Sequence, residues 1–125
     1  MNGLDWHTGS CHCGRVRFRV RFRSLEAIDC NCSICTKKAF EHLIVPEHDF
    51  ELETGQDALA EYRFHTGVAC HRFCRHCGVH PFYTPRSHPD QVDVNVRCLE
   101  PELRAHFRRV AFDGQNWEES LEGIR

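Results

Sequence analysis

Cysteines are the residues of this chain best suited to chemistry, and seven of the nine lie in three short clusters. These clusters are Cys11–Cys13, Cys30–Cys35 and Cys74–Cys77. Zinc takes four tetrahedral ligands, with thiolate sulfurs at about 2.3 Å, so its ligands must converge from short, closely spaced loops. Cysteines separated by one or two residues can do this, whereas cysteines that merely fill a core would be scattered along the chain. The spacing therefore predicts metal-binding sites.

The first and third clusters together supply four thiolates. Cys11 and Cys13 are separated by one residue, so on an extended backbone both side chains point to the same face. Cys74 and Cys77 have the spacing of a zinc knuckle, and Gly78 permits the tight turn that such a knuckle requires. We expect these four cysteines to form a closed, structural zinc site. The sequence leaves open whether Cys11 or Cys13 joins the middle cluster instead.

The middle cluster supplies three thiolates, Cys30, Cys32 and Cys35, within six residues. Three protein ligands leave one coordination position for water or a substrate, which is the arrangement of a catalytic zinc. A thiol that bound there would lose its proton, because the cation stabilises the thiolate. A fourth protein ligand would instead close the site. The residues that could supply one, if they do not simply fill the core or the surface, are Cys70, Cys98, His42 and His71.

Disulfides are the alternative use of so many cysteines. The odd number of cysteines, the short spacings and the absence of a secretion signal in Met1–Trp6 argue against them. We therefore expect a cytoplasmic protein. Its net charge of −2 and pI of about 6.5 do not favour a general affinity for nucleic acid. No stretch approaches the roughly 18 apolar residues needed to cross a bilayer, so a membrane partner is not expected either. The oligomeric state is left open.

The elements that must position the clusters are mainly strands. Residues Arg15–Arg23 alternate arginine with apolar side chains, which is the period of a half-buried strand. Val16, Phe18, Val20 and Phe22 should face the core, and the five arginines should face outward.

Other short strands are expected between turn-forming residues. They span Leu43–Val45, Phe50–Glu53, Leu59–Phe64, Val68–Phe73, Pro81–Tyr83 and Val92–Val96. Regularly spaced short strands predict a mainly β, antiparallel fold, and residues 1–125 should form one domain. Helices are expected only late, at Glu102–Phe107 behind Pro101 and at Trp117–Leu121.

The arginines allow a second kind of function to be considered. A row of cations on one strand face is a possible nucleic-acid surface, but no aromatic side chains interleave there, and a solvated strand face is favoured. Arg86 and Arg97 are candidates to bind the carboxylates of a thiol substrate, since guanidinium groups pair with carboxylates in a bidentate manner. Ordinary surface salt bridges are the alternative for both.

Three ordered motifs resemble the signature of a known family. They are Gly9–Gly14, Asp29–Cys35 and Phe73–Gly78. The likeness, from about Trp6 to Leu121, also includes Phe82–Ser87, Arg97–Leu99 and Asn116–Glu118. The pattern is similar to that of glutathione-dependent formaldehyde-activating proteins, also called the GFA or centromere-protein-V family. The resemblance implies an Mss4-like fold of the β-tent type, with antiparallel sheets stapled by zinc and short C-terminal helices.

The resemblance also implies a role for each cluster. In the family, the ligands of a structural zinc match Cys11, Cys13, Cys74 and Cys77. The ligands of a second, catalytic zinc match Cys30, Cys32 and Cys35. Two zinc ions per chain and glutathione as co-substrate are therefore expected. The founding activity of the family is formation and cleavage of the carbon–sulfur bond between glutathione and formaldehyde, which gives S-hydroxymethylglutathione.

The leading functional hypothesis is a zinc-dependent carbon–sulfur lyase acting on a glutathione, or similar thiol, adduct of formaldehyde or another small aldehyde. An acid or base must move the hydroxyl proton of the adduct, and His42 and Tyr83 are the candidates that the sequence offers. The alternative hypothesis is a non-catalytic zinc module with two closed sites that binds a macromolecular partner. A third is that glutathione occupies the open zinc without reacting.

Overall fold

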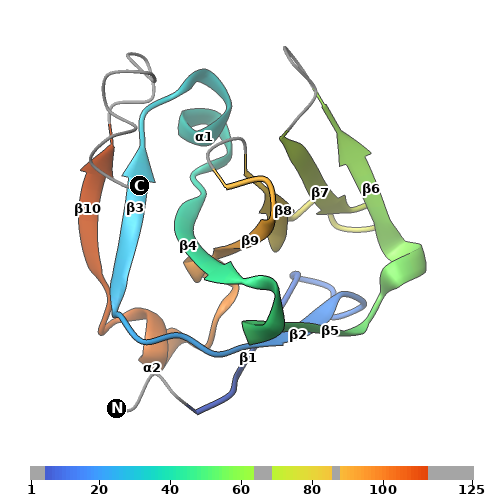
Figure 1. Ribbon diagram of the computed structural model, residues 1–125. Helices are drawn as coiled ribbons and strands as arrows, with labels where there is room; N and C mark the ends of the chain where they lie inside the picture. Colours follow the sequence, from blue (N-terminus) through green and yellow to red (C-terminus); the bar gives the residue numbers. More distant parts are fainter. Residues whose placement is uncertain (1–4, 64–68, 86–87, 113–125) are drawn as a thin grey trace.

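The computed structural model describes residues 5–63, 69–85 and 88–112, and these form two β-sheets with short helices between the strands (Figure 1). The smaller sheet has the order β1-β2-β5 and consists of β1 (His7–Ser10), β2 (Arg17–Val20) and β5 (Phe50–Thr54). The larger sheet has the order β10-β3-β4-β9-β8-β7-β6. Its strands are β3 (Glu26–Cys30), β4 (Glu41–Pro46), β6 (Leu59–Tyr62), β7 (Cys70–Cys74), β8 (Phe82–Thr84), β9 (Gln91–Asn95) and β10 (Arg108–Phe112).

The helices of the described residues are all short. The α-helices are α1 (Ser33–Lys38) and α2 (Pro101–Arg104), and the 3-10 turns are η1 (Glu47–Asp49), η2 (Gln56–Ala58) and η3 (Val96–Cys98). Pro101 stands in the first turn of α2, where its missing N–H costs no hydrogen bond. None of these helices has the length and apolar character that a membrane span requires.

The small sheet is built on the alternating segment that the sequence indicated. Val16, Phe18, Val20 and Phe22 are all buried, as predicted, although only Arg17–Val20 form the strand itself. Of the outward arginines, Arg19 and Arg21 meet acidic partners. Arg19 donates two hydrogen bonds to Glu51 Oε2, at 3.0 and 2.6 Å, and Arg21 Nε lies 3.0 Å from Asp49 Oδ1. Charge pairing at these two positions supports a solvated strand face.

The large sheet is antiparallel except at one edge. Strand β10 pairs with β3 in parallel, with Arg108 opposite Glu26 and Phe112 opposite Cys30. This pair is the parallel exception in a fold whose mainly β, antiparallel class is confirmed. Parallel neighbours need a long connection rather than a hairpin, and the chain between β3 and β10 provides one by passing through most of the fold.

Several elements differ from the sequence-based expectations. The pattern missed β1, β3, β10 and α1, because each is short and none shows a clear apolar period. The expected helix Glu102–Phe107 is the shorter α2, and β6 ends at Tyr62. The predicted helix Trp117–Leu121, the end of the predicted strand at Phe64 and the start of another at Val68 lie outside the described residues.

One hydrophobic core joins the two sheets. Phe18 of β2 stacks on Phe50 of β5 with ring centroids 5.5 Å apart, and its ring also meets that of Phe82 of β8 at 6.2 Å. Phe18 and Phe82 belong to one contiguous apolar cluster, which also contains Cys11 and Cys74, and Phe50 packs against it. The core thus brings the loop after β1 and the end of β7 together, and these two segments carry the first and third cysteine clusters.

Candidate metal centres

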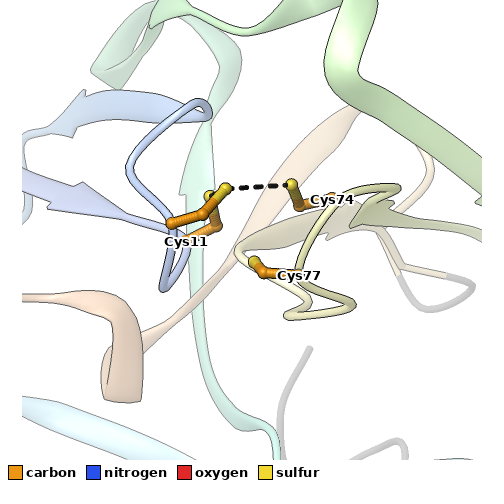
Figure 2. A group of neighbouring side chains, drawn as sticks. Cys11, Cys74 and Cys77 are labelled. Carbon is orange, nitrogen blue, oxygen red and sulfur yellow. Dashed lines mark hydrogen bonds between the residues drawn. The ribbon is translucent and has the colours of Figure 1, made fainter.

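The first and third clusters converge into one group of four sulfurs. The ligand atoms of Cys11, Cys13, Cys74 and Cys77 all lie within 4.8 Å of one another. Cys11 Sγ is 3.6 Å from Cys13 Sγ, and Cys13 Sγ is 3.7 Å from Cys74 Sγ. Zinc–sulfur bonds of 2.3 Å in a tetrahedron hold sulfurs about 3.8 Å apart, so this spacing fits zinc. Figure 2 shows Cys11, on the loop after β1, facing Cys74 at the end of β7 and Cys77 of the turn that follows.

Each pair of this group is presented by a tight turn that ends in a glycine. Gly14 and Gly78 have φ angles of 81° and 78°, in the left-handed region that favours glycine. The Gly78 N–H donates to the Cys74 carbonyl at 2.8 Å, and the Gly14 N–H donates to the Cys11 carbonyl at 3.3 Å. Both turns therefore curl the backbone so that two sulfurs point to one side.

The four-cysteine group also has an uneven electrostatic environment. Burial raises the pKa of Cys11 to about 11, despite a hydrogen bond of 3.4 Å donated by the Val16 N–H to its sulfur. Backbone and side-chain hydrogen bonds from Arg15 lower the pKa of the exposed Cys13 to about 6. Four adjacent thiolates repel one another, so a bound cation is needed to keep all four ionised.

The middle cluster forms a separate group of three sulfurs. The sulfurs of Cys30, Cys32 and Cys35 lie within 4.8 Å of one another. Cys30 ends β3, Cys32 is the N-cap of α1 and Cys35 lies inside that helix. The Cys35 N–H donates to Cys32 Sγ at 3.4 Å, which is the role that a serine or aspartate oxygen plays at most helix starts. The cap therefore orients one sulfur and nucleates the helix that carries another.

Protons are shared unequally among these three sulfurs. Hydrogen bonds from Cys30 and Cys35 lower the pKa of Cys32 to about 2. The hydrogen bond with Cys32 raises the pKa of Cys30 to about 11, and the pKa of Cys35 is raised further by Cys30, Cys32 and burial. The group alone therefore favours one thiolate and two thiols, and a divalent cation is what would allow three thiolates to coexist.

A fourth protein ligand is absent from this group among residues 5–63, 69–85 and 88–112. The four residues considered from the sequence have other surroundings. Cys70 is buried in β7, and Cys98 Sγ lies 3.8 Å from the carbonyl oxygen of His80. The His42 and His71 rings contact other side chains, described next. In the part of the chain that the structure describes, the middle cluster thus keeps three ligands.

A buried polar cluster lies among α1, β4, β7, β8 and β9. His42 Nδ1 is 2.6 Å from Asp93 Oδ2 and 3.3 Å from the Tyr83 hydroxyl. The His71 ring stacks on the Tyr83 ring with centroids 4.5 Å apart, and Lys38 Nζ lies 2.8 Å from His71 Nδ1. His42 and Tyr83, the acid–base candidates from the sequence, are only 4% and 7% exposed.

Sequence reasoning missed Lys38 and Asp93 as functional candidates. Lys38 follows Cys35 by three residues, which places it one helical turn away, so a helix prediction would have linked the two. Asp93 is an acid between two valines of a predicted strand, a pattern that signals a buried carboxylate.

A pocket of about 520 Å³ opens between α1 and the β6–β7 pair. The side chains around it are Ser33, Ile34, Lys37, Lys38, Glu61, Tyr62, Phe73 and His80. Ser33 and Ile34 lie between Cys32 and Cys35 in the sequence, so two residues of the pocket wall are direct chain neighbours of the three-cysteine group, although the cysteines themselves do not line the pocket. Burial lowers the pKa of His80 to about 4, so its ring is neutral at physiological pH.

Of the two arginines predicted to bind substrate carboxylates, Arg97 is the one that lies in the described residues. Arg97 Nη2 lies 3.8 Å from Glu41 Oε2, in an ion cluster that also includes Arg104 and Arg109. This is the salt bridge that the sequence left open as the alternative. Arg86 lies outside the described residues.

Comparison with known proteins agrees with the motifs. A family model described as glutathione-dependent formaldehyde-activating enzyme matches residues 6–117. The chain belongs to this GFA family. A crystal structure of a Rhodobacter sphaeroides protein superimposes on this chain with a TM-score of 0.72 at 30% sequence identity. The match covers 82% of this chain and 99% of the Rhodobacter chain. The matched residues include both cysteine groups and all the residues that line the pocket.

Proposed function

We propose that the protein is a zinc-dependent carbon–sulfur lyase. Its substrate would be the adduct of glutathione, or a similar small thiol, with formaldehyde or another small aldehyde. The observation that carries the proposal is the unequal pair of cysteine groups, one with four sulfurs and one with three beside a pocket. Membership of the GFA family supports the same substrate class.

Two zinc ions would occupy the two groups. Cys11, Cys13, Cys74 and Cys77 would hold a structural ion, and Cys30, Cys32 and Cys35 a reactive one. When bound by three thiolates, zinc lowers the pKa of a thiol placed at the remaining coordination position. Nine free cysteines suit a reducing compartment, and we therefore propose the cytoplasm as the location.

The pocket suits a small peptide thiol. Its volume of about 520 Å³ falls within the range of roughly 300–1,000 Å³ typical of small-ligand sites. Lys37 brings positive charge to it, which would attract the carboxylates of glutathione, and Phe73 offers an apolar surface. Lys37 would thus add a cation from the pocket to Arg86 and Arg97, which stay the predicted partners of these carboxylates.

The proposed reaction is an addition and its reverse, with no oxidation. In adduct formation, the thiol loses its proton and the sulfur lone pair forms a bond to the carbonyl carbon. The π electrons of the carbonyl group move to oxygen, which takes up a proton to become the hydroxyl group. Cleavage runs through the same steps in reverse and releases the aldehyde and the thiol.

The test is Cys32→Ser, because serine preserves the N-cap of α1 while removing one sulfur from the group of three. We expect zinc content to fall from two ions to one. Exchange between free formaldehyde and S-hydroxymethylglutathione, followed by NMR with ¹³C-formaldehyde, should slow by roughly 100-fold or more.

Cys98→Ser, outside both groups, is the matched control and should keep both ions and the exchange rate. Unchanged exchange in a Cys32→Ser protein that has lost that zinc would refute the lyase. Glutathione binding without any catalysed exchange in the unmodified protein would favour passive occupancy of the metal. Absence of glutathione binding would favour a non-catalytic module for a macromolecular partner.

A further inference from the structure

We propose that Lys38 is the catalytic acid–base residue that gives a proton to, and takes it from, the hydroxyl oxygen of the thiol–aldehyde adduct. This inference rests on the proposed lyase function and deepens it. It is carried by the position of Lys38, which lines the pocket, ends the helix that carries Cys35 and has its ammonium group held by three aromatic rings.

The ammonium group of Lys38 is held in one place. Its Nζ lies 2.8 Å from His71 Nδ1 and 4.6 Å from the ring centroids of both Phe40 and Tyr83. Phe40, His71 and Tyr83 are all buried, so the rings themselves have little freedom to move. A flexible lysine stem normally loses considerable entropy when it is ordered, and this cage has already ordered it.

His71 is suited to accept a hydrogen bond from Lys38. Burial, and then the neighbouring charge of Lys38, lower the pKa of His71 to about 4, so the imidazole is neutral at physiological pH. A neutral ring accepts through one nitrogen, and Nδ1 is the atom near Lys38 Nζ. His71 therefore positions the ammonium group of a lysine that also lines the pocket.

The charged and titratable groups around Lys38 set its acidity. Burial lowers the pKa of Lys38 to about 8, and nearby Cys35 and Cys32 on its own segment and Asp93 of β9 oppose that effect. His71 of β7 and Tyr83 of β8 contact it directly, and Lys37, Glu61 and His80 share its pocket. An ammonium group with a pKa near the working pH can both donate and regain a proton.

The other titratable groups nearby suit this role less well. His42 and Tyr83 are buried and joined to each other, and burial raises the pKa of Tyr83 well above its ordinary value. His80 lines the pocket, but with its pKa at about 4 it carries no excess proton at neutral pH. The side chain of Lys37 is exposed and lies on the same helix as Lys38.

The proton balance is simple. During adduct formation, a proton leaves the Lys38 ammonium group for the developing alkoxide oxygen, and the amine then regains the proton that the thiol released to solvent. During cleavage, the neutral amine takes the hydroxyl proton as the carbon–sulfur bond breaks and its electron pair returns to sulfur.

The first experiment compares Lys38→Met, Lys38→Arg and Lys37→Met in the zinc-loaded protein. We expect Lys38→Met to lower kcat for formaldehyde exchange by roughly 100- to 1,000-fold, with both zinc ions kept and the dissociation constant for glutathione changed by less than about threefold. Lys38→Arg keeps the charge, but the arginine proton is not transferable near neutral pH, so its kcat should stay low. Lys37→Met, in the same pocket, should raise KM and keep kcat within about twofold.

The second experiment measures the titration of Lys38 itself. Side-chain ¹⁵N NMR of the zinc-loaded protein, assigned with the Lys38→Met variant, should show one lysine that titrates near pH 8. The pH profile of kcat should bend at the same value and lose this bend in Lys38→Arg. A lysine titrating near its ordinary value of about 10.4 would overturn the inference.

The outcomes separate the inference from the function on which it rests. If the unmodified protein does not exchange formaldehyde, the lyase proposal fails. If it does, and Lys38→Met exchanges at the same rate with zinc and glutathione binding intact, only the role of Lys38 fails. Full activity in Lys38→Arg would show that Lys38 acts as a fixed charge, which also overturns proton transfer.

Discussion

The two cysteine groups differ in how much of the chain each one ties together. In the group of four, Cys13 and Cys74 are 61 residues apart; Cys13 follows β1 of the small sheet, and Cys74 ends β7 of the large sheet. The group of three spans six residues between the end of β3 and the middle of α1. Closing a long loop restricts the unfolded chain much more than closing a short one.

We infer from this difference that the group of four stabilises the fold and the group of three binds substrate. An ion in the group of four would contribute its binding free energy to the joining of the two sheets, because the site does not exist in the unfolded chain. An ion in the group of three would order one short segment, and its coordination would be available for substrate. The two groups can be compared by removing one sulfur from each.

The largest expected effect comes from Cys74→Ser, which removes a fully buried sulfur from the group of four. We expect the free energy of unfolding to fall by at least about 4 kcal/mol, or the fold to be lost, since structural zinc contributes more than this in small domains. Cys32→Ser in the group of three should cost less than about 2 kcal/mol. Denaturant unfolding followed by circular dichroism measures both, and equal losses would contradict the division of tasks.

A smaller effect is expected from acid. The folded pKa of His71, about 4, lies below the ordinary value of 6.5, so the unfolded chain binds the proton first as the pH falls. The stability that neutral His71 contributes is fully present above pH 6.5 and is lost as the pH falls toward 4. Between pH 6.5 and 5 this amounts to about 2 kcal/mol.

The control for the acid effect is His71→Asn, which keeps a hydrogen-bond acceptor near Lys38 and removes the titration. Its free energy of unfolding should be lower at pH 7 but should change less between pH 6.5 and 5. If the free energy of unfolding of His71→Asn fell with pH as steeply as that of the unmodified protein, the acid sensitivity would belong to other groups, such as the metal thiolates or His80.

The three cysteine clusters could be predicted from the sequence because the spacing within each cluster is a property of neighbouring residues. The side chains that surround the clusters come from distant parts of the chain. The alternating segment around Phe18 was also predictable, since period two is a property of consecutive residues. The pairing of β10 with β3 depends on segments about 80 residues apart, and no local pattern records it. The cage around Lys38 combines α1, β7 and β8 with Phe40, which precedes β4, so the sequence indicated Tyr83 but not the lysine beside it.

A medium-sized effect is expected from the ion cluster around Glu41, which lies beside the strand that carries Cys30. Arg109 binds Glu41 in a bidentate manner, with contacts of 3.0 and 2.9 Å, and holds the pKa of this carboxyl below its usual range. The Glu41 side chain is only 12% exposed, so Glu41→Gln should lower the free energy of unfolding by about 1–2 kcal/mol at pH 7. The loss should shrink as the pH falls through the folded pKa, because the carboxyl is then protonated in the unmodified protein as well.

Glu26→Gln is the matched control, because Glu26 of β3 pairs with another arginine of β10 at the same side of the large sheet. Glu26 accepts one hydrogen bond of 2.8 Å from Arg108, but both side chains are well exposed. Solvent screens such a pair, and the expected loss is below about 0.5 kcal/mol. Similar losses for Glu26→Gln and Glu41→Gln, measured by denaturant unfolding, would show that burial of the Glu41 carboxylate is not what makes its cluster stabilising.

The smallest effect is expected on the small sheet, where Arg19 and Glu51 pair across β2 and β5. Both side chains are more than a third exposed, so a double-mutant cycle with Arg19→Gln and Glu51→Gln should give a coupling free energy of about 0.5 kcal/mol that declines with salt. The same variants test the arginine face itself. If this face bound nucleic acid, Arg19→Gln would weaken binding to a short DNA duplex and reduce its salt dependence. Because Glu51 already neutralises Arg19, we expect no measurable binding before or after the substitution.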